Sequence, residues 1–596
     1  MKNHSIIQMR LARLHVLLML ALLITGATVE AQLPRIDSLS AQMLTRSGRL
    51  RILGANFGSG SGASQVLIDG HRAIVSRWSV SQITAYVPEQ SGPGSVAVQV
   101  VTLGGASNTI PLTVMLRQQQ GRVKWAFEAD VNNLWFRPAL APDGTVYVHG
   151  SEGFVFALTP DGGLKWIHKV NWYPYVPPQA GSEGEVYVGS IQRVTAINPD
   201  GTERWRFTDN ATQGIHVSAK PAPDGNIYAA NDFGLGAYSL TPGGQFRWSN
   251  PGNPALEWYG GSGAEMVFGP RAIGDSINQM YVAMNPLATQ SMLQAFRLSD
   301  GALQFSVPIG GTDPTTQNQT QPAVGPNGTI YITHLRGGGG IGWTLEAFSP
   351  TNGQSLWRYN SWNTSSFSPP DVGPDGVVYY VASLSRLVSF DPATPTERWN
   401  RFDGTVLFHP TVSPLNNMVV TGGVVTFGDL GFIKAISTGS GQLLWTVPLP
   451  GAPYPEPRVV PVHQPRFTPN GNTVYVSTTI LGGSATDPHS FLYAIATDST
   501  TDVIESSDIS SFRLLENYPN PFNPSTTIRY DLAKTGNVSL KVFDVLGREV
   551  TTLVNEEKLP GSYSVRWDAT NVGSGTYFYR LESNGRREIK KMLLMK

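Results

Sequence analysis

Apolar runs in the middle of the chain follow one repeated order. Each unit has an apolar strand, a Pro-Asp-Gly-like turn, a strand such as Val146-Tyr147-Val148, another apolar strand and a Gly-rich turn. An alternating strand with an aromatic residue closes each unit, at Trp125, Trp166, Trp205, Trp248, Phe305, Trp357, Trp399 and Trp445. A period of about 40 residues with several strands per unit predicts a β-propeller.

The two kinds of strand are out of phase. Eight strands of the Val-Tyr-Val type lie between Val146 and Val476, and eight aromatic strands accompany them. The first aromatic strand, at Trp125, has no unit before it, and the last three strands, ending at Ile495, have no aromatic strand after them. We therefore expect the Trp125 strand to complete the last blade of an eight-bladed ring. A seven-bladed ring remains an alternative, because the fourth and eighth units carry insertions.

Composition supports an all-β chain. The 596 residues include 63 Gly and 43 Pro, and only 14% are charged, which suits several domains rich in turns. The formal net charge of zero argues against a nucleic-acid footprint. Cys is absent, so disulfides, thiolate nucleophiles and Cys-based metal sites are excluded.

The N-terminus has the pattern of an export signal. Arg10 and Arg13 precede the apolar run Val16–Ile24, and the small residues that follow fit cleavage after Ala31. A retained membrane anchor is the alternative, but this run is much shorter than the roughly 20 residues that a span needs. We expect residues 1–31 to be a signal peptide and the processed chain to have no transmembrane anchor.

Residues 33–116 alternate apolar and polar positions in short runs, which predicts a small β-sandwich. This segment resembles the IPT/TIG family of immunoglobulin-like domains in Pro34–Ile36, Ile52–Gly58, Val66–Ile68, Trp78, Ile83–Pro88 and Ser107–Asn108. The resemblance implies a spacer or interaction module without chemistry of its own.

The repeats, over residues 122–498, resemble the quinoprotein-like (PQQ-type) propeller family, most closely in Ala347–Trp357 and Ala435–Trp445. The resemblance implies that the Trp packs between neighbouring blades and that the turn Gly adopts backbone angles denied to other residues. Many PQQ enzymes of that family hold the quinone against a disulfide, with Ca²⁺ bound by Glu, Asn and Asp. Because Cys is absent and no such acid–amide set is apparent, we expect no PQQ or other cofactor.

Other catalytic and metal signatures are also missing from the sequence. The ten histidines form no H-E-x-x-H motif or close pair, and there is no G-x-S-x-G elbow. The run Gly337–Gly340 lacks the Lys-Ser/Thr of a phosphate loop. Turns such as Pro142-Asp143-Gly144 occur once per blade, which favours hairpin turns over calcium sites. We therefore predict no catalytic, cofactor-binding or metal-binding residues.

The propeller has two unequal faces. We define the turn face by the tight connections from first to second and from third to fourth strands, and the loop face by the remaining connections. Aromatic and His residues gather in the longer loop-face segments, and exposed aromatics suit stacking on sugars or gripping a peptide. The alternative is that they cap the blade cores. The candidate ligand-binding residues are Trp135, Trp172, Tyr173, His216, Trp258, Tyr259, Trp343, Trp362, His409 and His463.

The C-terminal part is a separate β unit, residues 512–596, behind a polar, acidic linker at 499–511. It resembles the C-terminal sorting domain of the type IX secretion system in Leu515–Pro524, Val542–Val550, Gly561–Tyr563, Trp567 and Ser574–Tyr579. The resemblance implies the type IX secretion machinery as a partner and a place outside a Gram-negative cell, secreted or on the outer surface.

These features favour a non-catalytic binding protein that uses the aromatic loop face to bind a carbohydrate or a protein. Two alternatives remain at this stage. One is an enzyme, an oxidoreductase or hydrolase, with a site in the propeller funnel. The other is an envelope scaffold protein.

Overall fold

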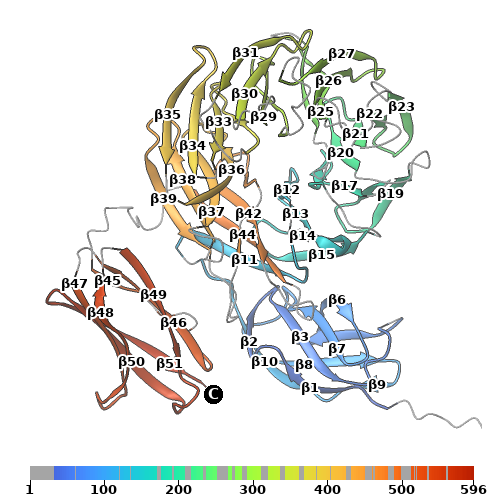
Figure 1. The fold of residues 1–596 in the computed structure, drawn as a ribbon. Coiled ribbons are helices and arrows are strands. Elements are labelled where there is room, and N and C mark those ends of the chain that lie inside the picture. The colour runs from blue at the N-terminus through green and yellow to red at the C-terminus, as the bar shows by residue number, and fades with distance from the viewer. Residues whose placement is uncertain are drawn as a thin grey trace, which may run out of the picture. The chain divides into compact units, whose positions relative to one another are not determined.

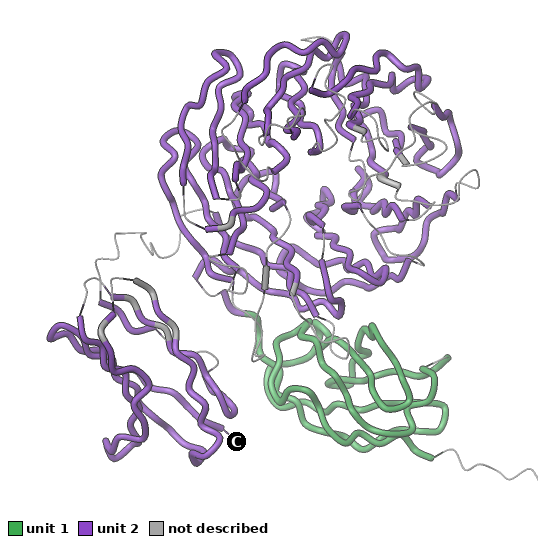
Figure 2. Tube along the Cα trace, viewed as in Figure 1, with its two compact units in different colours: residues 1–117 green, residues 118–596 purple. Residues whose placement is uncertain are grey.

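The computed structural model describes residues 32–60, 62–119, 121–134, 136–170, 176–190, 193–208, 217–231, 237–250, 266–271, 275–284, 291–310, 320–335, 343–360, 368–383, 385–402, 405–424, 431–449, 459–460, 464–480, 489–497, 512–515, 517, 520–532, 536–558 and 561–595. The predicted signal peptide and the linker at 499–511 lie outside these residues. Two compact units are distinguished, residues 1–117 and 118–596 (Figure 2).

The first unit contains two antiparallel-rich sheets. One has the order β1 (Arg35–Leu39), β3 (Arg49–Ala55), β7 (Gln82–Tyr86), β6 (Ile74–Trp78). The other has the order β2 (Met43–Thr45), β10 (Ile110–Met115), β8 (Gly94–Thr102), β4 (Gln65–Ile68), β5 (His71–Arg72), with β9 (Gly105–Ala106) beside β8. Alternate residues such as Ile52, Val66 and Val98 are fully buried between the sheets, which confirms the predicted sandwich.

The sheets between residues 123 and 496 are arranged around a ring (Figure 1). Seven are meanders of four consecutive strands: β12–β15 (Ala139–Leu140, Val146–His149, Phe154–Leu158, Leu164–Lys169), β16–β19 (Gln179–Ala180, Val186–Ser190, Arg193–Ile197, Glu203–Thr208), β20–β23 (Val217–Pro221, Ile227–Asn231, Ala237–Leu240, Phe246–Asn250), β24–β27 (Met266–Pro270, Ile277–Met284, Met292–Arg297, Leu303–Pro308), β28–β31 (Ala323–Val324, Ile330–Leu335, Trp343–Phe348, Ser355–Asn360), β32–β35 (Asp371–Val372, Val378–Ala382, Arg386–Asp391, Thr396–Phe402) and β36–β39 (Val406–Val412, Met418–Val424, Gly431–Ser437, Leu443–Pro448). A 3₁₀ turn, η1 (Ser151–Gly153), lies before β14. This architecture confirms the predicted propeller.

One further four-stranded sheet joins the two ends of the ring. Its order is β11 (Val123–Ala129), β44 (Ser490–Ala496), β42 (Thr473–Ser477), β41 (Arg466–Phe467). β11 pairs antiparallel with β44, with Trp125 opposite Ala494. The Trp125 strand therefore completes the last sheet, as its phase in the sequence predicted. A short ladder, β40 (Val459–Val460) with β43 (Thr479–Ile480), accompanies it.

The closing aromatic residue of a sheet packs on the next sheet. Trp125 donates its indole N–H to the carbonyl oxygen of Pro160 at 2.8 Å. Gly162 has a φ of +86°, and a Cβ there would lie 2.6 Å from the Trp125 ring. Equivalent indole bonds join Trp166 to Pro199 and Trp399 to Thr438, each at 2.8 Å. The expected role of the Trp and the turn Gly is thus confirmed.

The Pro-Asp-Gly segments form hairpin turns on the turn face. In the first, Asp143 Oδ1 accepts a hydrogen bond from the Thr145 amide at 2.9 Å, and Gly144 has a φ of +83°. The Asp side chain thus fixes its own turn, and Gly supplies the left-handed conformation.

The C-terminal strands form two sheets of their own. One is β45 (Arg513–Leu514), β46 (Ser525–Leu532), β49 (Gly561–Asp568), and the other is β48 (Glu549–Lys558), β47 (Gly536–Phe543), β50 (Gly575–Ser583), β51 (Arg586–Leu594). Leu540, Trp567, Tyr579 and Met592 are buried in their core. Within the described ranges, no helix has the length and apolarity required to cross a membrane.

Candidate functional site

Two of the ten predicted ligand-binding residues fall in the described parts of the chain. Trp343 is the first residue of β30 and is partly exposed, and His409 lies within β36 and is partly buried. They belong to different sheets, with the β32–β35 sheet between these two sheets in the chain. The other eight lie outside the described residues: Trp135, Trp172, Tyr173, His216, Trp258, Tyr259, Trp362 and His463.

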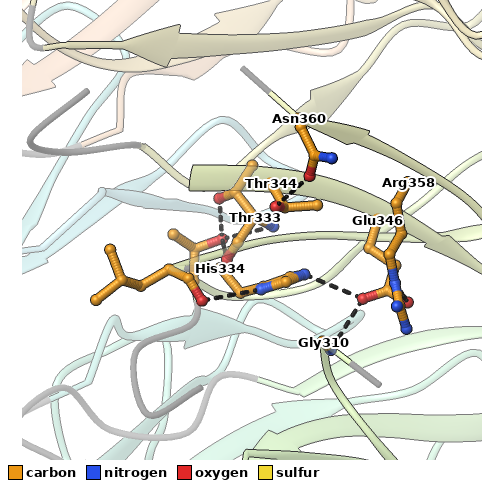
Figure 3. Close-up of polar contacts among 9 residues, drawn as sticks. Gly310, Thr333, His334, Thr344, Glu346, Arg358 and Asn360 are labelled. Atoms are coloured by element: carbon orange, nitrogen blue, oxygen red, sulfur yellow. Dashed lines mark hydrogen bonds and ion pairs between the residues drawn. The ribbon is translucent and has the colours of Figure 1, made fainter. Parts of the chain in front are cut away.

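On the same strand as Trp343, a buried carboxylate accepts hydrogen bonds from three different segments of the chain (Figure 3). Glu346 lies on β30 and has no exposed surface. Its Oε2 lies 3.0 Å from His334 Nε2 and accepts the Gly310 amide at 3.0 Å. Its Oε1 accepts a hydrogen bond from Arg358 Nε at 2.7 Å. We call these four residues the Glu346 cluster.

Strand register explains how these side chains meet. Glu346 is opposite Ile332 on β29 and opposite Arg358 on β31. His334 lies two residues beyond Ile332, so its side chain is on the same side of the sheet. Three neighbouring strands therefore bring Glu, His and Arg to one side, where the Gly310 amide of the preceding connection completes the set.

The cluster keeps Glu346 ionised. Burial raises the pKa of this carboxyl, but hydrogen bonds from His334, Ser355, Arg358 and Gly310 together hold its pKa below the usual value. The His334 ring is 3% exposed, and its Nδ1 lies 3.2 Å from the Leu335 carbonyl oxygen. Both ring nitrogens are thus engaged within the protein.

Each donor stands close to a loop-face connection. Gly310 follows the end of β27, His334 is next to the last residue of β29, and Arg358 is two residues before the end of β31. One carboxylate consequently ties together the chain at the start of three loop-face connections. The far ends of two of these connections are held as well, because Thr333 Oγ1 lies 2.7 Å from Thr320 Oγ1 and donates to the Ser368 carbonyl at 3.0 Å.

The sequence did contain a signal for this cluster. Glu346 interrupts an apolar strand, Leu345-Glu346-Ala347-Phe348, whose counterpart in the following sheet is Leu387-Val388-Ser389-Phe390. Because burying a charge is costly, a charged residue at a core position of such an apolar segment indicates a role other than packing. In the described part of the chain, no group of three or more His, Asp or Glu residues is placed to hold a metal ion.

The fold and the C-terminal unit together define a class, the exported multidomain β-propeller proteins. A family model described as a secretion system C-terminal sorting domain matches residues 516–595, which indicates type IX secretion and a place outside the cell or on its surface. A model described as IPT/TIG domain matches residues 34–114. Both matches confirm the resemblances found in the sequence.

The propeller supplies the family. The model described as outer membrane protein assembly factor BamB matches residues 78–255 and 342–490, more than half of the chain, and the chain belongs to this family. Its first match begins inside the IPT/TIG segment, so residues 78–114 are covered by both models.

Solved structures show the same architecture at low identity. The chain is 11% identical to the Dos1 propeller, with a TM-score of 0.50, and the match covers 63% of this chain and 94% of that one. For BamB from Moraxella catarrhalis the identity is 13% and the TM-score 0.43, covering 62% and 98%. For the quinohemoprotein alcohol dehydrogenase from Comamonas testosteroni they are 14% and 0.46, covering 66% and 78%. At these identities the likeness concerns the fold alone. No curated protein matches the chain.

Proposed function

We propose that this exported protein binds an extracellular glycan on the loop face of its propeller, at the part of that face that contains Trp343. The observation that carries the proposal is the Glu346 cluster. It holds the starts of three loop-face connections through one buried carboxylate, and one of these connections, from β29 to β30, ends at the partly exposed Trp343. A surface built in this way is preorganised, which lowers the cost of ordering it when a ligand binds.

The energetics of the cluster support a role beyond folding. Burying an ion costs several kcal/mol, and replacing a buried ionic network with apolar residues is often neutral or stabilising. The next sheet has Val388 at the position of Glu346 and completes the same four strands. Since the fold forms with an apolar residue there, the charge at Glu346 is explained better by the connections that it fixes.

The chemistry favours binding over catalysis at this point. A general acid or base must reach the proton that it moves, within hydrogen-bond distance of the substrate. Glu346 is fully buried and His334 is 3% exposed, so neither presents an atom to a substrate. Trp343 is partly exposed, and an indole ring stacks on the apolar face of a sugar.

The test is a glycan screen of the full processed chain, followed by titration of the best binder. Trp343→Ala should weaken binding by about tenfold or more, because truncating an aromatic anchor typically costs over 1 kcal/mol. Phe246→Ala is the matched control, since Phe246 is an exposed aromatic residue on the turn face, at the start of β23. Equal affinity of Trp343→Ala and the parent, or capture of protein ligands only, would reject the proposal.

A further inference from the structure

The propeller has a large cavity on the face opposite to the one discussed so far. Its volume is about 970 Å³, within the range of small-molecule sites. The cavity is lined mainly by residues of β12, β16, β24, β28, β32, β36 and β41 and of the turns that follow these strands. Three further residues of the lining, Arg137, Gln464 and Pro465, directly precede β12 and β41. All seven strands are the first strands of their sheets, and their ends lead into the turn face. The cavity is therefore the turn-face mouth of the central channel.

Prolines of the turns surround this mouth. The turns after the first strands contribute Pro142, Pro326, Pro374, Pro414 and Pro469 to the lining, and Pro270 is the last residue of β24. Inside them, part of the wall is apolar: Phe268 and Val324 come from neighbouring sheets, and both are partly exposed to the cavity. The Pro that fixes each tight turn thus also gives the mouth a rigid apolar rim.

The polar part of the wall comes from adjacent sheets on the other side of the ring. Arg137 Nη1 donates to Gln464 Oε1 at 3.1 Å, and Gln464 Nε2 donates to the Pro410 carbonyl oxygen at 3.4 Å. The amide therefore holds the guanidinium at the cavity wall. Arg466, on β41 two residues after Gln464, is exposed and lines the same wall.

One carboxylate accompanies the two arginines. Asp371 Oδ2 accepts the Val412 amide at 2.8 Å, which directs part of its hydrogen-bonding capacity to the backbone. Burial raises the pKa of Asp371, although the backbone amides of Val412 and Val372 and the charges of Arg137 and Arg466 act to lower it. Two guanidinium groups against one carboxylate leave this part of the wall with an excess of positive charge, while the second carboxylate of the lining, Asp275, belongs to the β24–β25 connection on the side of Phe268.

We propose that the turn-face mouth of the channel binds a small amphipathic carboxylate. Arg137 and Arg466 receive the carboxylate, because a guanidinium offers a planar pair of donors that match its two oxygens. Phe268 and Val324 receive the apolar body on the opposite wall. Arg137 and Gln464 lie in connections that lead from the loop face into β12 and β41, but the cavity includes neither Trp343 nor the Glu346 cluster. The proposal therefore does not depend on the glycan proposal.

The experiment uses the full processed chain and two probes, 3-phenylpropionate and its neutral amide, in calorimetric titrations. We expect the carboxylate to bind at least tenfold more tightly than the amide. The double variant Arg137→Gln/Arg466→Gln should lose this preference, while Arg35→Gln, which changes an exposed arginine of the first unit, should keep it.

Further variants separate a lost site from a lost fold. Gln464→Leu removes only the side chain that positions Arg137, so it should weaken carboxylate binding severalfold with an unchanged melting temperature. Trp343→Ala should leave carboxylate binding intact. Equal binding of the two probes, no binding of either at millimolar concentration, or an unchanged preference in both the double variant and Gln464→Leu would overturn the proposal.

Discussion

The β28–β31 and β32–β35 sheets are neighbours in the chain and share one scaffold. Each has a buried Tyr on the second strand beside an aromatic closing residue on the fourth. The ring centroids of Tyr331 and Trp357 are 6.0 Å apart, and those of Tyr379 and Trp399 are 5.9 Å apart. The positions that repeat in the sequence therefore build the same packing twice.

The two sheets differ at positions where the sequence repeat has no recurring residue. Register places Glu346, His334 and Arg358 of the first sheet at the positions of Val388, Ala382 and Asn400 of the second. The residues of the first sheet form an ionic cluster near the start of loop-face connections, whereas those of the second sheet are mostly apolar. The comparison teaches that the recurring residues specify the propeller, while local departures from them distinguish one blade from the next.

The largest difference in stability between variants of the two sheets should come from removing the carboxylate of Glu346. Glu346→Ala leaves Arg358, His334 and the Gly310 amide without their acceptor, and breaking a buried ion pair costs about 3–5 kcal/mol. Val388→Ala removes only apolar contacts and should cost about 2 kcal/mol. Calorimetric unfolding of both variants measures the difference. Equal losses would mean that the cluster adds nothing beyond packing.

Acid should reveal a second departure from the repeat, at His149. His149 is on β13, at the position that Thr333 has in the β28–β31 sheet and Val381 has in the β32–β35 sheet. It is buried, and its ring contacts the Val176 carbonyl oxygen. Burial lowers the pKa of His149 from 6.5 to about 4. Because the unfolded chain then binds the proton first, stability falls as the pH drops from 6.5 towards 4.

The expected loss over this window is about 3 kcal/mol. Unfolding measured from pH 7 to pH 4 should show this component in the parent and lack it in His149→Gln. Val381→Ala is the control, since it perturbs the equivalent position without a titrating group. The same acid dependence in His149→Gln as in the parent would contradict the assignment.

Glycine turns give the smallest expected difference. Gly353 in the first sheet has a φ of +72°, and a Cβ there would lie 2.6 Å from the Phe305 ring. Gly376 in the second has a φ of +83° with nothing within 4 Å of an added Cβ. Gly353→Ala combines backbone strain with overpacking, whereas Gly376→Ala brings strain alone, so their melting curves should differ by about 2 kcal/mol. If Gly353→Ala lost no more stability than Gly376→Ala, the Phe305 ring would be able to move away from the added Cβ at little cost.

The sequence predicted the parts of the fold that repeat. The phase of the aromatic strands predicted that β11 would pair with the final strands, and the resemblance of the repeats to the quinoprotein-like family predicted that the closing Trp packs between neighbouring blades. Both follow from short-range patterns that occur several times, so each copy supports the others.

The sites could not be predicted in the same way. The Glu346 cluster depends on register across three strands and on an amide 36 residues earlier in the chain. The cavity was not predicted because each turn around it is ordinary by itself. Only closure of the ring brings Arg137 to Gln464, which is 327 residues away in the sequence. The ten aromatic and His residues of the loop face stay a prediction, with Trp343 and His409 placed by the described residues.

Closure through β11 also determines how the propeller responds to tension. Val123 lies opposite Ile495, and Arg122 and Ala496 are joined by a backbone hydrogen bond of 2.8 Å, so the chain enters and leaves at one end of one antiparallel pair. A force pulling on the preceding and following segments acts at that end. It separates the β11–β44 hydrogen bonds one after another, as a zipper opens, rather than loading them all together in shear. If the exported chain is held by its tail while its N-terminal part is pulled, the β11–β44 seam is the mechanical weak point of the ring.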